Sequence, residues 1–225
     1  RSSDLHVCDE FRELYDHVHG AKPYCMPFKV TILNAWGKVR SWGTHMVAHA
    51  LWYKEIYSYS GVLEALSGMP FDVSFISFDD ILEDPHVLDD AGVIINAGDA
   101  YTAYSGGEYW ADPRIIEAMR RFVYNGGGFI GVGEPTAYQR NGHFFQLYDV
   151  LGVDKELGFS LSTDKYNWEE KEHFLTENFA ETIDFGEEVK NIYALNGTTV
   201  LKDDRHNIMF AANTYGKGRS VYLRG

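Results

Sequence analysis

Apolar runs of strand length recur along the chain, separated by amphipathic or polar segments. A strand that is covered on both faces loses the alternation of apolar and polar positions, so a near-continuous apolar run predicts a buried strand. Such runs occupy residues 29–34, 72–78, 92–97 and 128–132. Because helical segments lie between these runs, we expect a three-layer α/β fold with a mostly parallel sheet.

Two segments have the spacing and the end signals of helices. One follows Asp112 and Pro113, a capping residue and a first-turn proline, and ends at residues 125–126, Asn-Gly. The other has apolar residues at helical spacing over residues 5–18 and ends at Gly20. The apolar stripe of this leading helix needs a partner to pack against, inside the chain or outside it.

The last third of the chain favours β-structure after an irregular stretch. Residues 144–151 predict a short helix, and residues 152–186 are polar and acidic with little period. Strand-like runs then follow, separated by turn residues, at residues 191–195, 198–201, 208–212 and 220–223. We expect these runs to form an antiparallel edge on the parallel sheet.

The composition is that of an acidic globular protein. The chain has 225 residues, of which 45% are hydrophobic, and a formal net charge of −13. This length fits one main domain at residues 28–225 behind a leading helix and linker at residues 1–27. The acidic balance disfavours nucleic acid and anionic membrane surfaces as partners, because both attract clustered Lys and Arg. The chain opens without methionine, so we expect a piece of a larger protein.

The cysteine content and the absence of export signals favour a cytoplasmic protein. Cys8 and Cys25 are too few for a disulfide framework, although a single bridge between them stays open. No run approaches the roughly 20 apolar residues of a membrane span, and no charged-then-apolar leader begins the chain.

The residues that follow the predicted parallel strands are the first candidates for a ligand site, because ligands of open α/β sheets bind at the carboxyl ends of the strands. The first strand runs into an aromatic and basic loop that holds Arg40, Trp42 and His45. Asp99 and Glu134 each follow a central strand, where a carboxylate can hold hydroxyls or a basic side chain. Either acid can equally cap a helix or form an internal ion pair, and the aromatic loop can equally be core or interface.

Neither a nucleotide nor a metal is indicated. Residues 131–135, Gly-Val-Gly-Glu-Pro, lack the third glycine of a dinucleotide fingerprint, because Thr136 stands in its place and proline interrupts the turn. His45 and His49 have the spacing of a helical metal pair, but no third ligand is evident. Polar packing or sugar contact explains these histidines better, so we expect no metal and no organic cofactor.

The strand and turn at residues 130–134 resemble, in placement, the nucleophile turn of class I glutamine amidotransferase-like proteins. In those proteins a cysteine occupies the strained turn and attacks an amide carbonyl beside a histidine. Here the place is held by Gly133 or Val132, and both cysteines precede the first strand. The resemblance implies the amidotransferase-like (flavodoxin-like) fold with its nucleophile removed.

Longer strings are more specific, among them Lys29-Val-Thr-Ile-Leu-Asn-Ala-Trp-Gly-Lys-Val-Arg-Ser-Trp42, Leu63-Glu-Ala-Leu-Ser-Gly-Met69, Phe129-Ile-Gly-Val-Gly-Glu-Pro135, Asp149-Val-Leu-Gly-Val-Asp154 and Tyr215-Gly-Lys-Gly-Arg219. Through them the chain, from Lys29 onward, closely resembles the lacto-N-biose/galacto-N-biose phosphorylase family. The resemblance implies that this is the middle domain of a larger enzyme whose preceding TIM barrel holds the active site.

Family enzymes cleave a β-galactoside with inorganic phosphate and invert the anomeric centre. The resemblance thus implies α-galactose 1-phosphate and a free sugar as products, the sugar being N-acetylglucosamine, N-acetylgalactosamine or rhamnose. One carboxylic acid protonates the leaving oxygen, and phosphate replaces the activated water of an inverting glycosidase. That acid belongs to the barrel, so we expect this chain to be inactive alone and the whole enzyme to be a homo-oligomer.

Three functions of different classes remain open. The first is a non-catalytic domain that shapes or closes the barrel's site, with Arg40 suited to phosphate and Trp42, His45, Asp99 and Glu134 suited to sugar. The second is a pure assembly module whose aromatic loop is buried against a partner. The third is an independent amidotransferase-type hydrolase, for which the chain shows no nucleophile.

Overall fold

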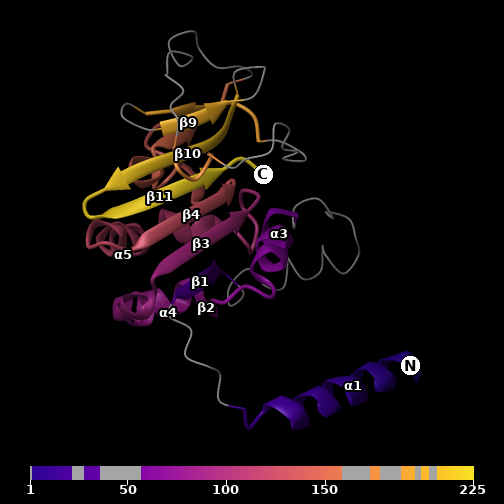
Figure 1. Ribbon diagram of the computed structural model, residues 1–225. Coiled ribbons are helices and arrows are strands. Elements are labelled where there is room, and N and C mark those ends of the chain that lie inside the picture. The colour runs from indigo at the N-terminus through magenta and orange to yellow at the C-terminus, as the bar shows by residue number, and fades with distance from the viewer. Residues whose placement is uncertain are drawn as a thin grey trace.

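The computed structural model describes residues 2–21, 28–35, 57–158, 173–177, 189–195, 199–202 and 207–225. Within these ranges the chain forms one seven-stranded sheet and two small two-stranded sheets. Helices cover the faces of the large sheet, and the helix at the amino terminus lies apart from it (Figure 1). The expected α/β fold is confirmed.

The large sheet is mostly parallel and has an antiparallel edge, as predicted. Its order in space is β2 (Asp72–Ser77), β1 (Lys29–Asn34), β3 (Val93–Gly98), β4 (Gly128–Gly133), β11 (Gly218–Leu223), β10 (Ile208–Tyr215) and β9 (Thr199–Lys202). The strands from β2 to β11 in this order pair in parallel, whereas β10 runs antiparallel to both of its neighbours. The carboxyl-terminal hairpin β10–β11 therefore extends the sheet beyond β4.

The pairing register brings the carboxyl ends of the central strands together. Gly98, the last residue of β3, lies opposite Gly133, the last residue of β4. Residues that are far apart in the sequence but directly follow these two strands therefore start from the same edge of the sheet. We call this edge, with the segments that begin at Asp99 and Glu134, the carboxyl edge.

Different helices cover the two faces of the sheet. On one face lie α4 (Phe78–Glu83), the 3-10 helix η2 (Pro85–Asp90), α5 (Pro113–Tyr124) and α6 (Tyr148–Leu151). The main hydrophobic core lies beneath them and includes Leu33, Ile94 and Phe129 of the strands. The helix α3 (Tyr57–Leu66) packs on the other face, where Tyr59 contacts a smaller cluster around Ile32.

The helix α5 begins and ends where the sequence predicts. The Asp112 carboxylate accepts a 2.9 Å hydrogen bond from the backbone N–H of Arg114, and Pro113 is the first helical residue. Asn125 ends the helix, and Gly126 follows with a left-handed φ of 124°. These are the end signals that satisfy otherwise unpaired backbone groups of a helix.

The leading helix α1 spans Ser2–Val18, which confirms the helix expected at residues 5–18. Its side chains Phe11, Leu14 and Tyr15 are 68%, 58% and 62% exposed. None of the helices in the described part of the chain combines the length and the apolar character that crossing a bilayer requires.

Two expectations for the later part of the chain are wrong. Residues 144–151 do not form one helix, because β6 (His143–Phe145) pairs with β5 (Ala137–Arg140) and only α6 follows. The run at 191–195 does not join the edge, because β8 (Ile192–Ala194) pairs with β7 (Val153–Lys155) in a separate sheet. Buried Asp154 of β7 contributes to this arrangement, since its carboxylate accepts the backbone N–H groups of both Phe144 and Phe145.

Candidate functional site

The turn after β4 is the point at which the resemblance to amidotransferases placed a nucleophile. Gly133 occupies this turn with a left-handed φ of 76°, a conformation that favours glycine. A Cβ at this position would lie 2.9 Å from Ser58 Oγ and 3.3 Å from the Gly98 carbonyl oxygen. Val132 is instead 5% exposed and packs in the core. Gly133, and not Val132, is therefore the residue at the nucleophile position of the turn, and it has no reactive side-chain atom.

A buried tyrosine hydroxyl donates a hydrogen bond to the turn. Tyr222 of β11 donates a 3.0 Å hydrogen bond from its hydroxyl to the Gly133 carbonyl oxygen, and its side chain is fully buried. Burial raises the pKa of Tyr222, and the negative charge of Glu134 raises that pKa further. The phenol therefore stays neutral and acts as a permanent donor to the turn.

Glu134 directly follows the turn and forms an internal ion pair. Its Oε1 pairs with Lys155 Nζ, and its Oε2 accepts a 2.9 Å hydrogen bond from the backbone N–H of Ala100. The side chains of Glu134 and Lys155 are only 14% and 23% exposed. The ammonium of Lys155 also lies 5.0 Å from the ring centroid of Phe144. Of the alternatives considered for Glu134, the structure shows the ion pair.

Asp99 begins a loop that is tied closely to the carboxyl edge. Its backbone carbonyl oxygen accepts hydrogen bonds from Thr102 Oγ1 at 2.7 Å and from Ser105 Oγ at 2.5 Å. The Ser105 carbonyl in turn accepts the indole N–H of buried Trp110, in the 3-10 helix η3 (Gly107–Ala111), at 2.6 Å. With the Ala100–Glu134 bond, these contacts join the loop to the turn after β4. The structure thus brings the segments of Asp99 and Glu134 together, as the parallel strands predicted.

Sequence reasoning missed Tyr101, which this loop presents at the carboxyl edge. Tyr101 has a left-handed φ of 62° and is 51% exposed, and its ring lies edge-on to Phe144 at 6.3 Å. A left-handed tyrosine is uncommon, and such residues persist where the surroundings hold them and cluster at functional sites. No local pattern in the sequence signals this conformation, and the neighbouring Ala100 N–H is bonded to Glu134, which is distant in sequence.

The other predicted site residues lie outside the described residues. Arg40, Trp42 and His45 all follow β1 in the stretch 36–56, as does His49, so their proximity to Asp99 and Glu134 stays a prediction. Within the described residues, no group of three or more His, Cys, Asp or Glu side chains could hold a metal ion.

The described carboxyl edge offers binding groups without an activated nucleophile. The ion pair of Glu134 with Lys155 is internal, and the exposed ring of Tyr101 lies on a tightly hydrogen-bonded loop. Nucleophilic catalysis of the amidotransferase type would need a reactive side chain at the turn after β4, and Gly133 supplies none there.

The comparison with protein families finds one family that matches most of the chain. The family described as lacto-N-biose phosphorylase central domain matches residues 29–225. The chain belongs to this family. This result confirms the resemblance inferred from the long strings after Lys29.

Two curated relatives support the assignment to the lacto-N-biose phosphorylase central domain family. A 1,3-beta-galactosyl-N-acetylhexosamine phosphorylase of Lachnoclostridium phytofermentans is 60% identical over 219 residues, which is 97% of this chain and 30% of that protein. A D-galactosyl-beta-1->4-L-rhamnose phosphorylase of the same organism is 35% identical, over 96% of this chain and 29% of that protein. The chain thus spans about 30% of the length of these relatives.

Among solved structures, a cytoplasmic protein of Salmonella typhimurium resembles the fold of this family member. The TM-score is 0.56, the sequences are 14% identical, and the match covers 88% of this chain and 87% of the other. At this identity the likeness extends to the fold alone.

Proposed function

We propose that this chain is the central, non-catalytic domain of an enzyme that phosphorolyses a β-galactoside to α-galactose 1-phosphate with inversion. Membership of the lacto-N-biose phosphorylase central domain family, and the chain's span of about 30% of its relatives' length, support the claim that it is the central domain of such an enzyme. The observation that carries the claim of a non-catalytic domain is Gly133, a glycine with φ 76° at the turn where an amidotransferase has its nucleophile.

The domain's role is to complete or close a site whose acid catalyst lies in a preceding TIM barrel. Residues 28–225 form the domain, and residues 1–27 connect it to the barrel. The carboxyl edge faces the sugar and phosphate, with Arg40 at the phosphate and Trp42, His45, Asp99 and Glu134 near the sugar. Because Glu134 is paired with Lys155, its contribution is to hold the edge in shape, so the pair positions neighbouring groups.

The proposed reaction needs inorganic phosphate as co-substrate and no organic cofactor. The released sugar is N-acetylglucosamine, N-acetylgalactosamine or rhamnose, because the two relatives differ in this respect by name. The enzyme is cytoplasmic, and its protomers assemble as a homo-oligomer.

The test uses the full-length protein that contains this chain. Phosphate-dependent release of α-galactose 1-phosphate is measured with β-1,3-linked galactosyl-N-acetylhexosamines and with β-1,4-linked galactosyl-rhamnose, in parallel with glutaminase activity. We expect phosphorolysis of one linkage and no glutamine hydrolysis. Glutamine hydrolysis, or turnover of either disaccharide by residues 1–225 alone, would overturn the proposal.

A second function, assembly, is favoured by the exposed apolar side chains of α1. Phe11, Leu14 and Tyr15 are exposed apolar side chains at helical spacing, and exposed apolar patches of this kind mark interaction sites. The variants Arg40→Gln and Trp42→Ala in the full-length enzyme separate the two functions, with Arg114→Gln as an exposed control. Weaker phosphate or sugar affinity with unchanged assembly supports the ligand site. Dissociation with unchanged affinity supports an assembly module that uses the aromatic loop as an interface, and dissociation of a Phe11→Ser variant alone supports one that uses α1.

A further inference from the structure

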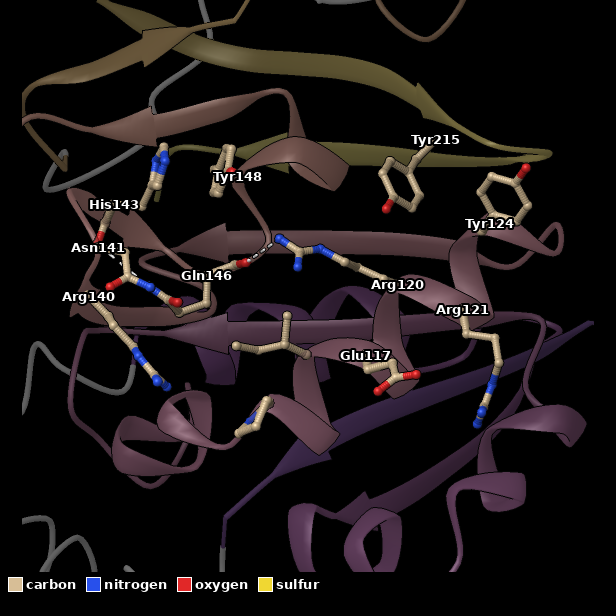
Figure 2. A pocket seen from close by; sticks show the side chains of 12 residues that line it. Glu117, Arg120, Arg121, Tyr124, Arg140, Asn141, His143, Gln146, Tyr148 and Tyr215 are labelled. Atoms are coloured by element: carbon tan, nitrogen blue, oxygen red, sulfur yellow. Dashed lines mark hydrogen bonds between the residues drawn. The ribbon is translucent and has the colours of Figure 1, made fainter.

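A groove on the α5 face of the sheet is separate from the carboxyl-edge residues described above. It lies between α5, the hairpin β5–β6 and the end of β10, and has a volume of about 720 Å³ (Figure 2). Small-molecule sites commonly measure about 300–1,000 Å³, so the groove has room for a ligand of the size of a substituted monosaccharide. Gly133, Asp99 and Glu134 are not among its lining residues.

The lining of the groove is positively charged in a chain whose net charge is −13. Arg120, Arg121 and Arg140 line it, and Glu117 is the one acidic residue among its described lining residues; because Asp149 pairs with Arg120, the excess positive charge is carried by Arg121 and Arg140. Local charge of this sign, opposed to that of the protein as a whole, attracts anions and disfavours cations. Figure 2 shows Arg120 in the middle of the groove, Arg140 beside the hairpin and Arg121 toward the opposite end.

Protein contacts hold two of the arginines without using all of their donors. Arg120 binds Asp149 Oδ1 through Nε at 3.2 Å and through Nη2 at 3.0 Å. Arg140 donates from Nη1 to the Ala111 carbonyl oxygen at 2.5 Å. Arg121 forms no ion pair with any described residue. A guanidinium carries five N–H donors in a planar fork that matches phosphate, so anchored arginines still offer donors to an anion.

Aromatic rings supply the other half of the site. Tyr148 stacks face to face on His143, with ring centroids 3.6 Å apart and an interplanar angle of 3°. Tyr124 is 58% exposed and lies edge-on to Tyr215 at 6.1 Å. Tyrosines present an apolar face and a hydroxyl together, which suits the apolar face and the hydroxyls of a sugar ring.

The hairpin side of the groove is preorganised by a buried carboxylate. His143 Nδ1 lies 2.7 Å from Asp154 Oδ2, and the Asp154 side chain is fully buried. The other Asp154 oxygen accepts the backbone N–H groups of Phe144, Phe145 and Lys155 at 3.1, 2.9 and 2.8 Å. His143 and, through stacking, Tyr148 are thus fixed before any ligand arrives, which lowers the entropy cost of binding.

We propose that this groove is a second binding site, outside the carboxyl edge, for a phosphorylated sugar. Arg120 in the middle of the groove binds the phosphate, Arg121 and Arg140 toward its two ends attract the phosphate by their charge, and the stacked rings of Tyr148 and His143 contact the sugar. The choice of α-galactose 1-phosphate as the probe rests on the proposed function, since it is the product of that reaction.

Calorimetry on the full-length enzyme tests the groove. We expect wild-type enzyme to bind two molecules of α-galactose 1-phosphate per chain, one in the catalytic site and one in the groove. The variants Arg121→Gln and Arg140→Gln each raise the Kd of the groove by about tenfold, because each removes a positive charge that attracts the phosphate. The double variant retains one bound molecule per chain and a kcat within about twofold of wild type. Arg114→Gln, on the same helix outside the groove, serves as the matched control.

Three outcomes separately test the groove as a binding site, the assignment of a sugar and the proposed function. Two bound molecules per chain in the double variant would overturn the groove as a binding site. If the double variant unfolds at a lower midpoint than wild type, the single variant Arg121→Gln provides the test instead. Equal affinity of the groove for inorganic phosphate would overturn the assignment of a sugar. An enzyme without phosphorolysis, in which Arg121→Gln still abolishes a bound sugar phosphate, would reject the proposed function while supporting the groove.

Discussion

The Tyr222 hydroxyl donates a 3.0 Å hydrogen bond to the carbonyl oxygen of Gly133, across 89 residues of sequence. Tyr222 belongs to β11 and Gly133 ends β4, and these two strands pair in parallel. The bond therefore fastens the carboxyl-terminal hairpin to the turn at the carboxyl edge. The proposed role of shaping a neighbouring site needs a rigid turn here, since the geometry of a site depends on the contacts that hold it.

Replacing Tyr222 by Phe tests this bond directly. The Tyr222→Phe variant keeps the packing of the ring but leaves the Gly133 carbonyl oxygen without this donor in a buried setting. We expect a loss of about 1–3 kcal/mol in the free energy of unfolding, measured by urea titration. Tyr101→Phe, at an exposed tyrosine, is the control and should change the free energy little. A Tyr222→Phe variant as stable as wild type would show that the bond contributes nothing.

The same residue makes a prediction for alkaline pH. Burial raises the pKa of Tyr222 above its ordinary value of 10.0, and burial with the charge of Asp154 raises that of Tyr193. Above about pH 10 the unfolded chain loses these phenol protons while the folded chain retains them. The unfolded state then binds fewer protons, so the free energy of unfolding falls as pH rises through this range.

We expect the Tyr222→Phe variant to lose stability less steeply than wild type between about pH 9 and pH 11, because one contributing phenol is gone. Urea unfolding midpoints across this range provide the measurement. The slope, rather than the absolute midpoint, is the quantity to compare, since the variant starts from a lower stability. Identical slopes for the two proteins would contradict the role assigned to burial of Tyr222.

A third prediction concerns the ion pair between Glu134 and Lys155. Removing one partner of a largely buried pair leaves a charge without compensation, so Lys155→Met should cost about 3 kcal/mol of unfolding free energy. Glu134→Gln with Lys155→Met removes both charges and retains an acceptor for the Ala100 N–H, so the double variant should recover much of that loss. A double-mutant cycle by urea unfolding measures this coupling. Additive single effects would mean that the two side chains do not interact energetically.

The sheet itself was accessible from the sequence because each central strand is a short apolar run with clear ends. The helix α5 was equally accessible, since Asp112, Pro113 and Asn125 are local signals that act through backbone chemistry. The convergence of Asp99 and Glu134 followed from a general property of parallel sheets. These inferences depend on residues close to one another or on strand direction, which sequence patterns report well.

The long-range contacts of the site could not be predicted from the sequence in the same way. Lys155 reaches Glu134 from β7, a three-residue strand whose pairing with β8 is set by tertiary contacts around buried Asp154. The groove draws its arginines from α5 and from the hairpin β5–β6, which no periodicity relates. The left-handed Tyr101 follows Ala100, whose backbone N–H donates to Glu134 across 34 residues of sequence. Long-range contacts of this kind override local propensity and leave no signal in a single sequence.

The last prediction addresses the glycine at the turn itself. Gly133→Ala places a Cβ in a left-handed conformation, which costs about 1–2 kcal/mol by itself, and 2.9 Å from Ser58 Oγ. Adding Ser58→Ala removes that oxygen and leaves its Cβ at 3.5 Å, an ordinary contact, so the second change should restore part of the lost stability. Thermal unfolding of the two single variants and the double variant measures the coupling, with Gly142→Ala as a left-handed glycine that has open space around it. If Gly133→Ala and Gly142→Ala lose equal stability and Ser58→Ala brings no recovery, backbone conformation alone explains the glycine, and close packing of α3 against the turn does not.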